Sequence, residues 1–268
     1  MDNIHDETNM LRDRKRPKDE KQYTQKDGTI IQNAIAYWSD YSAASSSIVD
    51  KYFRGLDVFI SECKNSKCGH IVRQFQPSDL CVLSIAGAPD PVNLDQLIRR
   101  HQQREELPDL LCETCNQRGR TRLTKFARLP DRLAFSLNRF HHTGGTGRGA
   151  ANKIHTKVRF PIRNLDLTQY CLEADRRTPE TNDPHFVGPM RYDCYAVTVH
   201  QGGGIGSGHY FTYVENDQSR DPTDWYRCND TRVDPVKIGS RLPDDQTEIM
   251  YADGNTSAYM VYYRRQGT

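Results

Sequence analysis

Two features that would place a protein at a membrane or on nucleic acid are missing from this sequence. No stretch reaches the ~18 apolar residues that a membrane-spanning helix requires, and the opening segment MDNIHDETNMLRDRKRPKDEKQ has no apolar core of a secretory signal. Charge is balanced, with 37 Lys and Arg against 35 Asp and Glu, so no strong field attracts anionic surfaces. We therefore expect a cytoplasmic and/or nuclear protein whose partners include no membrane and no nucleic acid.

Cysteine is absent before residue 63, and apolar residues are scarce throughout. The apolar fraction is 36%, low for one compact unit, which indicates tails or long loops. Residues 1–28 mix acids and bases with almost no apolar periodicity, and we expect them to form a disordered charged tail. The eight cysteines, without a secretory signal, favour reduced thiols or metal ligands over disulfides.

Apolar periodicity predicts helices first and mainly strands afterwards. The spacing over residues 30–56 predicts two amphipathic helices separated at AASSS, and NLDQLIRRHQQREEL predicts a further helix with Asn93 as its N-cap. LDVFISECKNSKCGHIVRQFQP has the form of a hairpin around a polar turn, and RLAFSLNRF alternates like a half-buried strand. Further strands are predicted in RYDCYAVTVHQ, GHYFTYVEN and AYMVYYRR, and a surface loop over residues 171–190.

Four cysteines form two closely spaced pairs, Cys63-x4-Cys68 and Cys112-x2-Cys115. Four thiolates from two such turns can form a tetrahedral zinc site. The alternative is four reduced cysteines that never meet. A redox pair is disfavoured, because Cys112 does not open a helix after a strand. The pattern therefore indicates structural zinc.

A single histidine follows a glycine-rich run and opens a predicted strand, in GGGIGSGHYFTYVEN. Some twenty positions after His209, the segment WYRCNDTRV supplies Asn229 and Asp230. An Asn or Asp that holds one imidazole nitrogen leaves the other free to take a proton, as in a Cys-His-Asn or Cys-His-Asp triad. On spacing alone, a structural histidine is the alternative. Nucleotide binding is disfavoured, because the glycines lead into a strand rather than a helix.

Taken together, these segments resemble the C-terminal two-thirds of a ubiquitin-specific protease domain, a papain-like cysteine protease family. The resemblance runs in family order from about residue 29 to residue 265. The matching segments are VDKYFRG, ECKNSKCGH, LCETC, KFARLPDRLAFSLNRF, KIHTKVRFPIRNLDL, YDCYAVTVHQGG, GHYFTYVE, WYRCNDTRV and AYMVYYRR.

The resemblance implies an α+β fold with an incomplete helical thumb, zinc-bearing β fingers at about 57–130 and a sheet palm at about 131–266, which form one partial catalytic domain over 29–266. It implies binding to ubiquitin and ubiquitinated proteins. It also implies roles for particular residues: zinc ligation by Cys63, Cys68, Cys112 and Cys115; the catalytic base at His209; its orientation by Asn229, with Asp230 as a second candidate; and a channel for the ubiquitin tail at Gly206, Gly208 and Tyr210.

The sequence departs from the family pattern in three places. The first cysteine pair is C-x4-C where the family usually has C-x2-C, and LNRF replaces LKRF through Asn138. The family's nucleophile motif, G-N-T-C-[YFW]-M-N, is absent before Cys63. GNTSAYM, with Ser257, lies at the wrong end of the chain, and Cys228 lacks the helix N-terminus that would activate its thiol.

The missing nucleophile leaves two principal interpretations. In the first, the sequence is a deubiquitinase without its N-terminal portion, whose family reaction is thiol-dependent hydrolysis after the last glycine of ubiquitin and which is inactive as written. In the second, it is a non-catalytic ubiquitin-binding or scaffold protein. A zinc-ribbon nucleic-acid module is disfavoured by the balanced charge and by the lack of a basic, aromatic stripe.

Overall fold

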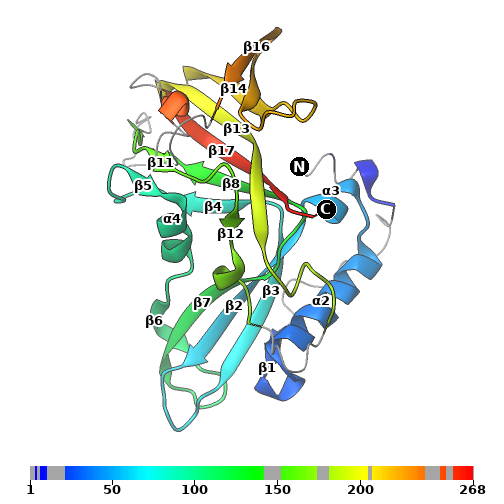
Figure 1. Ribbon diagram of the computed structural model, residues 1–268. Helices are drawn as coiled ribbons and strands as arrows, with labels where there is room; N and C mark the ends of the chain where they lie inside the picture. The colour runs from blue at the N-terminus through cyan, green and yellow to red at the C-terminus, as the bar shows by residue number, and fades with distance from the viewer. Residues whose placement is uncertain are drawn as a thin grey trace.

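The computed structural model describes residues 4, 7–10, 22–141, 152–173, 181–204, 207–238, 248–251 and 256–267. These residues form a mostly β protein with two main sheets. The narrow sheet lies in the lower part of Figure 1 and the broad sheet in the upper part. We call them the finger sheet (strands β1, β3, β2, β7 and β6) and the palm sheet (strands β16, β15, β14, β13, β17, β8 and β4 in order). Over the described residues, no helix is long and apolar enough to span a membrane.

The elements of the first half are β1 (Gln22–Thr24), η1 (Gln25–Asp27), α2 (Ile30–Ala44), α3 (Ile48–Tyr52), β2 (Gly55–Cys63), β3 (Ile71–Ser78), β4 (Cys81–Ser84), β5 (Val92–Asn93), α4 (Leu94–His101), β6 (Glu105–Leu111) and β7 (Arg118–Arg128). Those of the second half are β8 (Arg132–Asn138), β9 (Phe140–His141), β10 (Asn152–Lys153), β11 (Val158–Arg159), β12 (Leu165–Asp166), η2 (Thr168–Tyr170), β13 (Arg191–Gly204), β14 (Ser207–Glu215), β15 (Asp224–Asn229), β16 (Arg232–Lys237), η4 (Glu248–Tyr251) and β17 (Thr256–Arg265).

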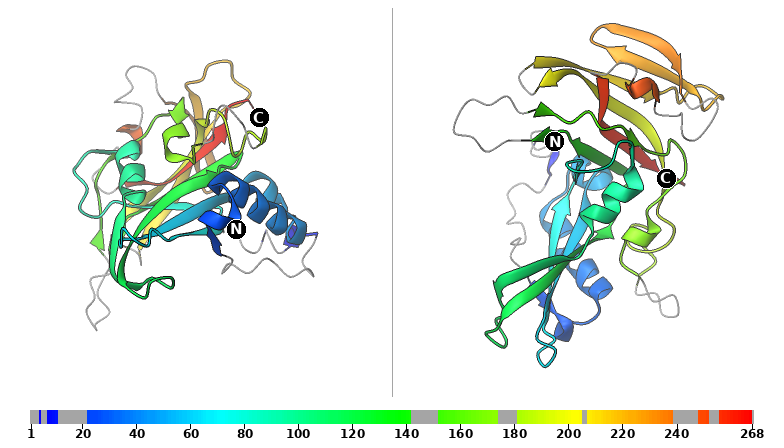
Figure 2. Two further views of the ribbon diagram at one scale, coloured as in Figure 1. Left: turned by 90° about the horizontal axis from the view of Figure 1, so that it is seen from below. Right: turned by 90° about the vertical axis from the view of Figure 1, so that its left-hand side faces the viewer.

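The finger sheet is built from two long hairpins that lie side by side. The predicted hairpin is confirmed: β2 pairs antiparallel with β3 from Gly55↔Ser78 to Glu62↔Ile71. On its other edge β2 pairs with β7, and β7 pairs with β6. The ends of both hairpins therefore meet at the same end of the sheet, far from the palm, as Figure 2 shows in its right-hand view.

Helices α2 and α3 form where the sequence predicts them, and side-chain caps mark their N-terminal ends. The helix predicted over NLDQLIRRHQQREEL is shorter than expected: α4 ends at His101, because Glu105–Leu107 pair with β7 as part of strand β6. Thr29 caps α2 by accepting from Gln32 N at 3.2 Å, and Ser47 caps α3 after the predicted break. Asn93 is the N-cap residue of α4, although the capping bond comes from Gln96, whose side-chain oxygen accepts from Asn93 N at 2.9 Å. Two short polar side chains, Thr29 and Ser47, therefore mark the starts of α2 and α3, and Gln96 marks the start of α4.

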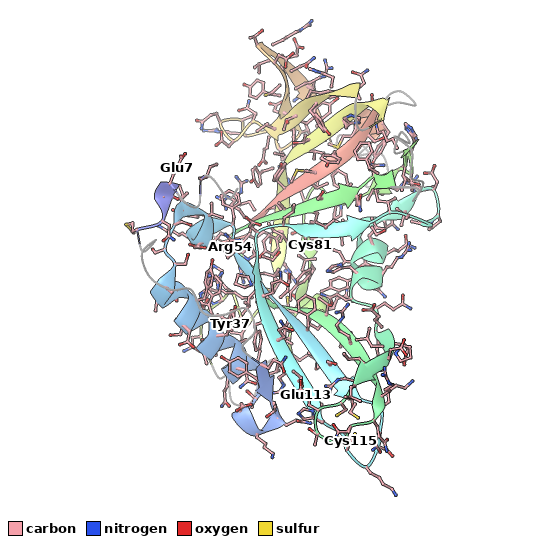
Figure 3. All side chains as sticks on the ribbon, turned by 180° about the vertical axis from the view of Figure 1, so that it is seen from behind. Glu7, Tyr37, Arg54, Cys81, Glu113 and Cys115 are labelled. Atoms are coloured by element: carbon pink, nitrogen blue, oxygen red, sulfur yellow. The ribbon has the colours of Figure 1, made fainter. Side chains whose placement is uncertain are left out.

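Helix α2 packs along one face of the finger sheet, as Figure 1 shows. Tyr37, labelled in Figure 3, is fully buried, and its ring centroid lies 5.7 Å from that of Phe75 in β3. The guanidinium of Arg128 lies 4.0 Å from the centre of the Trp38 ring, a cation–π contact. These aromatic contacts attach the helix to the base of the fingers.

Part of the predicted tail belongs to the finger sheet. Residues 22–27 form β1 and η1, and β1 pairs with β3 from Gln22↔Gln74 to Thr24↔Val72. Tyr23 is buried, with its ring centroid 5.5 Å from that of Phe75. The other residues predicted as a tail lie largely outside the described residues.

The prediction of a half-buried strand over RLAFSLNRF is wrong in one respect. Strand β8 occurs there, but Ala134 and Ser136 are buried as well as Phe135 and Leu137. The reason is position: β8 lies between β17 and β4 in the interior of the palm sheet, and both of its faces are covered. Period-2 alternation in the sequence therefore does not mark an exposed face here.

A half-buried carboxyl lies where the finger sheet joins the palm sheet. Asp57 stands at an irregularity between β2 and β7, near Cys81, which Figure 3 labels at this junction together with Arg54. Burial raises the pKa of the Asp57 carboxyl to about 7, although a hydrogen bond with Ser78 acts in the opposite direction. The folded protein therefore holds a proton here that the unfolded chain releases at lower pH.

This proton predicts a pH-dependent stability. The pKa of Asp57 rises from about 3.9 in the unfolded chain to about 7 in the folded one. The stabilisation of the folded state by the protonated carboxyl is therefore fully present below about pH 4 and is lost as the pH rises to about 7. We expect Asp57→Asn to remove this slope and to raise the free energy of unfolding at pH 8 on the order of 2 kcal/mol. Urea unfolding at pH 5 and pH 8 measures the free energy of unfolding and its change with pH, and Asp109→Asn, at an exposed position, is the control. An equal change between the two pH values in wild type and in Asp57→Asn would contradict the prediction.

Candidate functional site

The two predicted cysteine pairs meet at the end of the finger sheet, where Figure 3 labels Cys115. Cys63 ends β2 and Cys68 follows in the β2–β3 turn, whereas Cys112 and Cys115 lie in the β6–β7 turn. All four sulfur atoms lie within 4.8 Å of one another. The turns are closed by main-chain hydrogen bonds, including Cys63 N to His70 O at 2.9 Å and Cys112 N to Gln117 O at 2.9 Å.

The sulfur positions fit a metal ion. Cys63 Sγ lies 3.7 Å from Cys115 Sγ, and Cys68 Sγ lies 3.8 Å from Cys112 Sγ. A tetrahedron with metal–sulfur bonds of about 2.3 Å has edges of about 3.8 Å. The longer C-x4-C spacing therefore brings its two sulfurs into the same cluster, and the four cysteines can hold a metal.

Protonation within the cluster is uneven. Although desolvation opposes ionisation, hydrogen bonds from the main-chain N–H groups of Cys115 and Thr114 lower the pKa of the Cys112 thiol to about 5. A main-chain hydrogen bond at His70 favours the Cys68 thiolate, but desolvation and the neighbouring sulfurs raise the pKa of Cys68 to about 12. The turns thus favour one thiolate, and a bound cation would favour deprotonation of the other thiols as well.

The second cluster lies in the palm sheet, some distance along the molecule from the cysteines, and contains His209 and Asn229. His209 stands near the start of β14, opposite Gln201 of β13, and Asn229 ends β15. Their side chains form a short hydrogen bond between His209 Nε2 and Asn229 Oδ1. The structure therefore brings together His209 and Asn229, the pair to which the family resemblance assigns the base and its orienting residue.

This hydrogen bond determines which imidazole nitrogen is basic. The Asn229 amide oxygen is an acceptor, so Nε2 of His209 carries the proton and Nδ1 has the free lone pair. Within the described residues, no hydrogen bond to Nδ1 is found. The side chain of His209 is 43% exposed, so the imidazole ring is in contact with solvent.

Asp230 lies at the margin of this cluster. Its carboxylate is 3.9 Å from His209 Nε2, and its side chain is 78% exposed. Its φ of 50° places it in the left-handed region, at the turn between β15 and β16. Asp230 therefore shapes the hairpin turn, while Asn229 makes the direct contact with the histidine.

The predicted channel residues are placed differently from one another. Gly206 lies outside the described residues. Gly208 precedes His209, and a Cβ atom built there would meet His200 Nε2 at 2.1 Å, so only glycine fits. Tyr210 is 48% exposed, and its ring lies beside that of Tyr259, with the centroids 5.5 Å apart and the planes tilted by 59°. Because neighbouring side chains alternate along a strand, Tyr210 and His209 lie on opposite faces of β14.

No cysteine of the chain stands beside His209 in the described structure, which includes all eight of them. Cys228 lies on the neighbouring strand β15, where it pairs with Thr212 of β14. Cys228 directly precedes Asn229 on the strand, so the two side chains point to opposite faces of the sheet. The face that carries His209 therefore has no thiol from these residues.

Sequence reasoning missed several buried polar residues around the palm site. Arg139 is fully buried and donates to the carbonyl oxygens of Ala258, Ile154 and Thr156. Lys153 and His200 are also buried, at 6% and 2% exposure. Only the family resemblance of LNRF marks Arg139, and no periodicity or spacing marks the other two.

Comparison with known proteins identifies the family. The family described as ubiquitin carboxyl-terminal hydrolase (UCH) matches residues 1–263, and the chain belongs to it. The human ubiquitin carboxyl-terminal hydrolase 3 is 31% identical over 175 residues, which are 64% of this chain and 28% of that protein. Ubiquitin carboxyl-terminal hydrolase 9 of Arabidopsis thaliana is 33% identical over 155 residues, 58% of this chain and 14% of the relative. The chain thus spans less than a third of the length of these relatives.

A solved structure shows the same fold. The SAGA DUB module containing Ubp8, Sgf11, Sus1 and Sgf73, bound to monoubiquitin, matches with a TM-score of 0.63 and 20% identity. The match covers 89% of this chain and 47% of the other. The described residues therefore have the fold of the ubiquitin-specific protease family of deubiquitinases, with a cysteine cluster that is consistent with zinc binding.

The contact between His209 and Asn229 predicts the tautomer of the imidazole. We expect the Nε2-protonated form to predominate in the wild-type chain and Asn229→Ala to give a mixture of both tautomers, because the acceptor is lost. Long-range ¹H–¹⁵N correlation spectra of the histidine rings measure the ratio. Asp230→Ala is the matched control, since its carboxylate lies 3.9 Å from Nε2 and is exposed. A larger change in the tautomer ratio in Asp230→Ala than in Asn229→Ala would show that Asp230, and not Asn229, orients the ring.

Proposed function

We propose that this chain is a ubiquitin-specific protease-like domain that binds ubiquitin and ubiquitinated proteins and presents the base of a cysteine protease to the ubiquitin tail. The observation that carries the proposal is the pairing of His209 Nε2 with Asn229 Oδ1, which leaves Nδ1 free at the end of the palm sheet. Support comes from the family match over residues 1–263 and from a structural relative that is bound to monoubiquitin.

The chemistry that this pair serves is acyl transfer. His209 Nδ1 would take the proton of a cysteine thiol, the thiolate would attack the carbonyl carbon of the last ubiquitin glycine, and the imidazolium would return the proton to the leaving lysine amine. Asn229 would hold the ring throughout and stabilise the imidazolium through its amide oxygen. In this proposal the domain has a papain-like architecture in which α2 and α3 are part of the thumb.

The described residues supply the base but no thiol on its face of the sheet. We therefore propose that the chain binds ubiquitin without cleaving it, and that hydrolysis requires a nucleophile from outside these 268 residues. A role as a non-catalytic ubiquitin-binding scaffold is the second candidate, favoured by the same placement of Cys228 away from His209. A cytoplasmic or nuclear location remains a prediction from composition.

Zinc is the proposed metal of the cysteine cluster. Four thiolates with edges near those of a tetrahedron are the ligand set that Zn²⁺ takes in structural sites, where no position is left open for a substrate. A bound zinc ion would join the β2–β3 turn to the β6–β7 turn. The fingers have little apolar core at this end, so the metal would hold them in the shape that contacts ubiquitin.

Elemental analysis tests the zinc proposal. We expect one zinc ion per folded chain and its loss in Cys112→Ser, because a serine hydroxyl does not replace a thiolate ligand. Cys228→Ser, a half-buried cysteine outside the cluster, is the control and should keep its zinc. Folded wild-type protein without zinc would refute the assignment of the metal.

Binding measurements with ubiquitin test the main proposal. We expect the chain to bind ubiquitin and to bind ubiquitin without its last two glycines at least about tenfold more weakly, a loss of about 1.4 kcal/mol. Tyr210→Ala and Tyr226→Ala should leave both affinities unchanged, because Tyr210 lies on the opposite face of β14 from His209 and Tyr226 is an exposed tyrosine on the neighbouring strand β15. Isothermal titration calorimetry measures all of these affinities.

Two results would contradict this proposal. Equal affinity for intact and shortened ubiquitin would show that the tail does not reach the palm site. A covalent adduct with ubiquitin that carries a thiol-reactive C-terminus, abolished by Cys228→Ala, would show that the chain has its own nucleophile.

A further inference from the structure

We propose that Lys153 and His200 are positioning residues that fix His209 from behind. They act on the end of β13 and the start of β14, the two pieces of main chain that carry the base. The inference rests on the proposed function only because that function gives His209 a reaction to serve. Its geometry involves neither ubiquitin nor a nucleophile.

Lys153 holds the end of β13 by its ammonium group. Its Nζ atom donates to His200 O at 2.8 Å and to Gly202 O at 3.0 Å, and the side chain is 6% exposed. These carbonyls flank Gln201, the residue that pairs with His209 across the two strands. Carbonyl groups two residues apart point to the same edge of a strand, so one ammonium can take the place of a neighbouring strand there.

The position of this contact explains why a charge is used. The register between β13 and β14 is irregular between Gln201 and Gly204, so the ladder does not itself fix this part of β13. A buried ammonium is costly unless its N–H groups are bonded, and once they are bonded it resists displacement. Regular pairing with β14 ends at Gln201, and Lys153 therefore holds the main chain of β13 in place at this point.

His200 supports the start of β14. It lies opposite Tyr210, its side chain is 2% exposed, and its ring centroid is 4.7 Å from that of Tyr210 and 5.7 Å from that of Phe140. Its Nε2 atom occupies the space that a Cβ at Gly208 would need, at 2.1 Å. The main chain just before His209 therefore rests directly on the imidazole of His200.

His200 acts here as a neutral aromatic ring. Burial, followed by the charge of Lys153, lowers the pKa of its imidazole. Its Nδ1 atom has no hydrogen-bond partner among the described residues. The ring is on the opposite face of the sheet from His209, so it supports the base without competing for Asn229.

The support is needed because Asn229 alone does not fix the base. Asn229 holds Nε2, but the direction of Nδ1 also depends on the main chain of residue 209. The segment before it contains Gly202, Gly203 and Gly204, and glycine has the greatest main-chain freedom. Rigidity must therefore come from neighbouring side chains, and Lys153 and His200 provide it.

Histidine-ring NMR on the full chain tests the inference. In Lys153→Met the side chain keeps its length but loses its donors, and we expect the ratio of the Nε2-protonated to the Nδ1-protonated tautomer of His209 to fall at least about fivefold. Lys153→Arg should restore the ratio, because a guanidinium can donate to both carbonyls. Lys125→Met is the control: Lys125 donates to a single main-chain carbonyl, Gln169 O at 3.2 Å, at the finger sheet, and its loss should leave His209 unchanged.

The inference is wrong if folded Lys153→Met, judged by its amide spectrum and a single thermal transition, keeps the wild-type tautomer ratio at His209. Should Lys153→Met fail to fold, His200→Ala tests the same support and should also lower the ratio; an unchanged ratio in that folded variant overturns it equally. Adding ubiquitin to the same wild-type sample separates the two proposals, because absence of binding counts against the proposed function while the tautomer ratio still reports on positioning.

Discussion

The antiparallel register between β13 and β14 determines where the groups of the palm site lie. From Ala196↔Val214 to Gln201↔His209 the pairing is regular, and beyond it the register shifts. A slip of one residue would move His209 to the other face of the sheet, away from Asn229, and would bring Tyr210 into its place. The regular pairing up to Gln201↔His209 therefore places His209 on the same face as Asn229, and this contact leaves one imidazole nitrogen free.

The palm fixes its irregular segments with cations that donate to main-chain carbonyls. Arg139 bonds to the carbonyls of Ile154, Thr156 and Ala258, and Lys153 bonds to those of His200 and Gly202. Both cations are buried, and both join residues 153–156 to central strands of the palm sheet: Arg139 to β17 and Lys153 to β13. Breaking either contact would leave a buried charge without its partners, which costs more than the contact contributes. The irregular chain around the site is thus rigid without being part of a long strand.

The sequence predicts the parts of the structure that chemistry restricts and fails where burial decides. Cysteine pairs have few uses in a reduced protein, so the cluster of Cys63, Cys68, Cys112 and Cys115 could be proposed from spacing, and the contact of His209 with Asn229 from the strand pattern and the family resemblance. Residues 22–28 look like a charged tail in the sequence because Tyr23 is the only buried residue among them. Lys153 and His200 look like ordinary surface residues in the sequence, because their roles depend on main-chain atoms that are distant in the chain.

The position of β17 within the palm sheet has a consequence for how the protein is made. Strand β17 comes last in the sequence, yet it lies between β13 and β8 and completes the centre of the sheet. During synthesis, one edge of β8 and one edge of β13 stay unpaired until residues 256–265 have been made. The strands of the finger sheet are complete much earlier. A chain that stops before β17 would therefore leave the unpaired main-chain N–H and C=O groups of β8 and β13 available for aggregation.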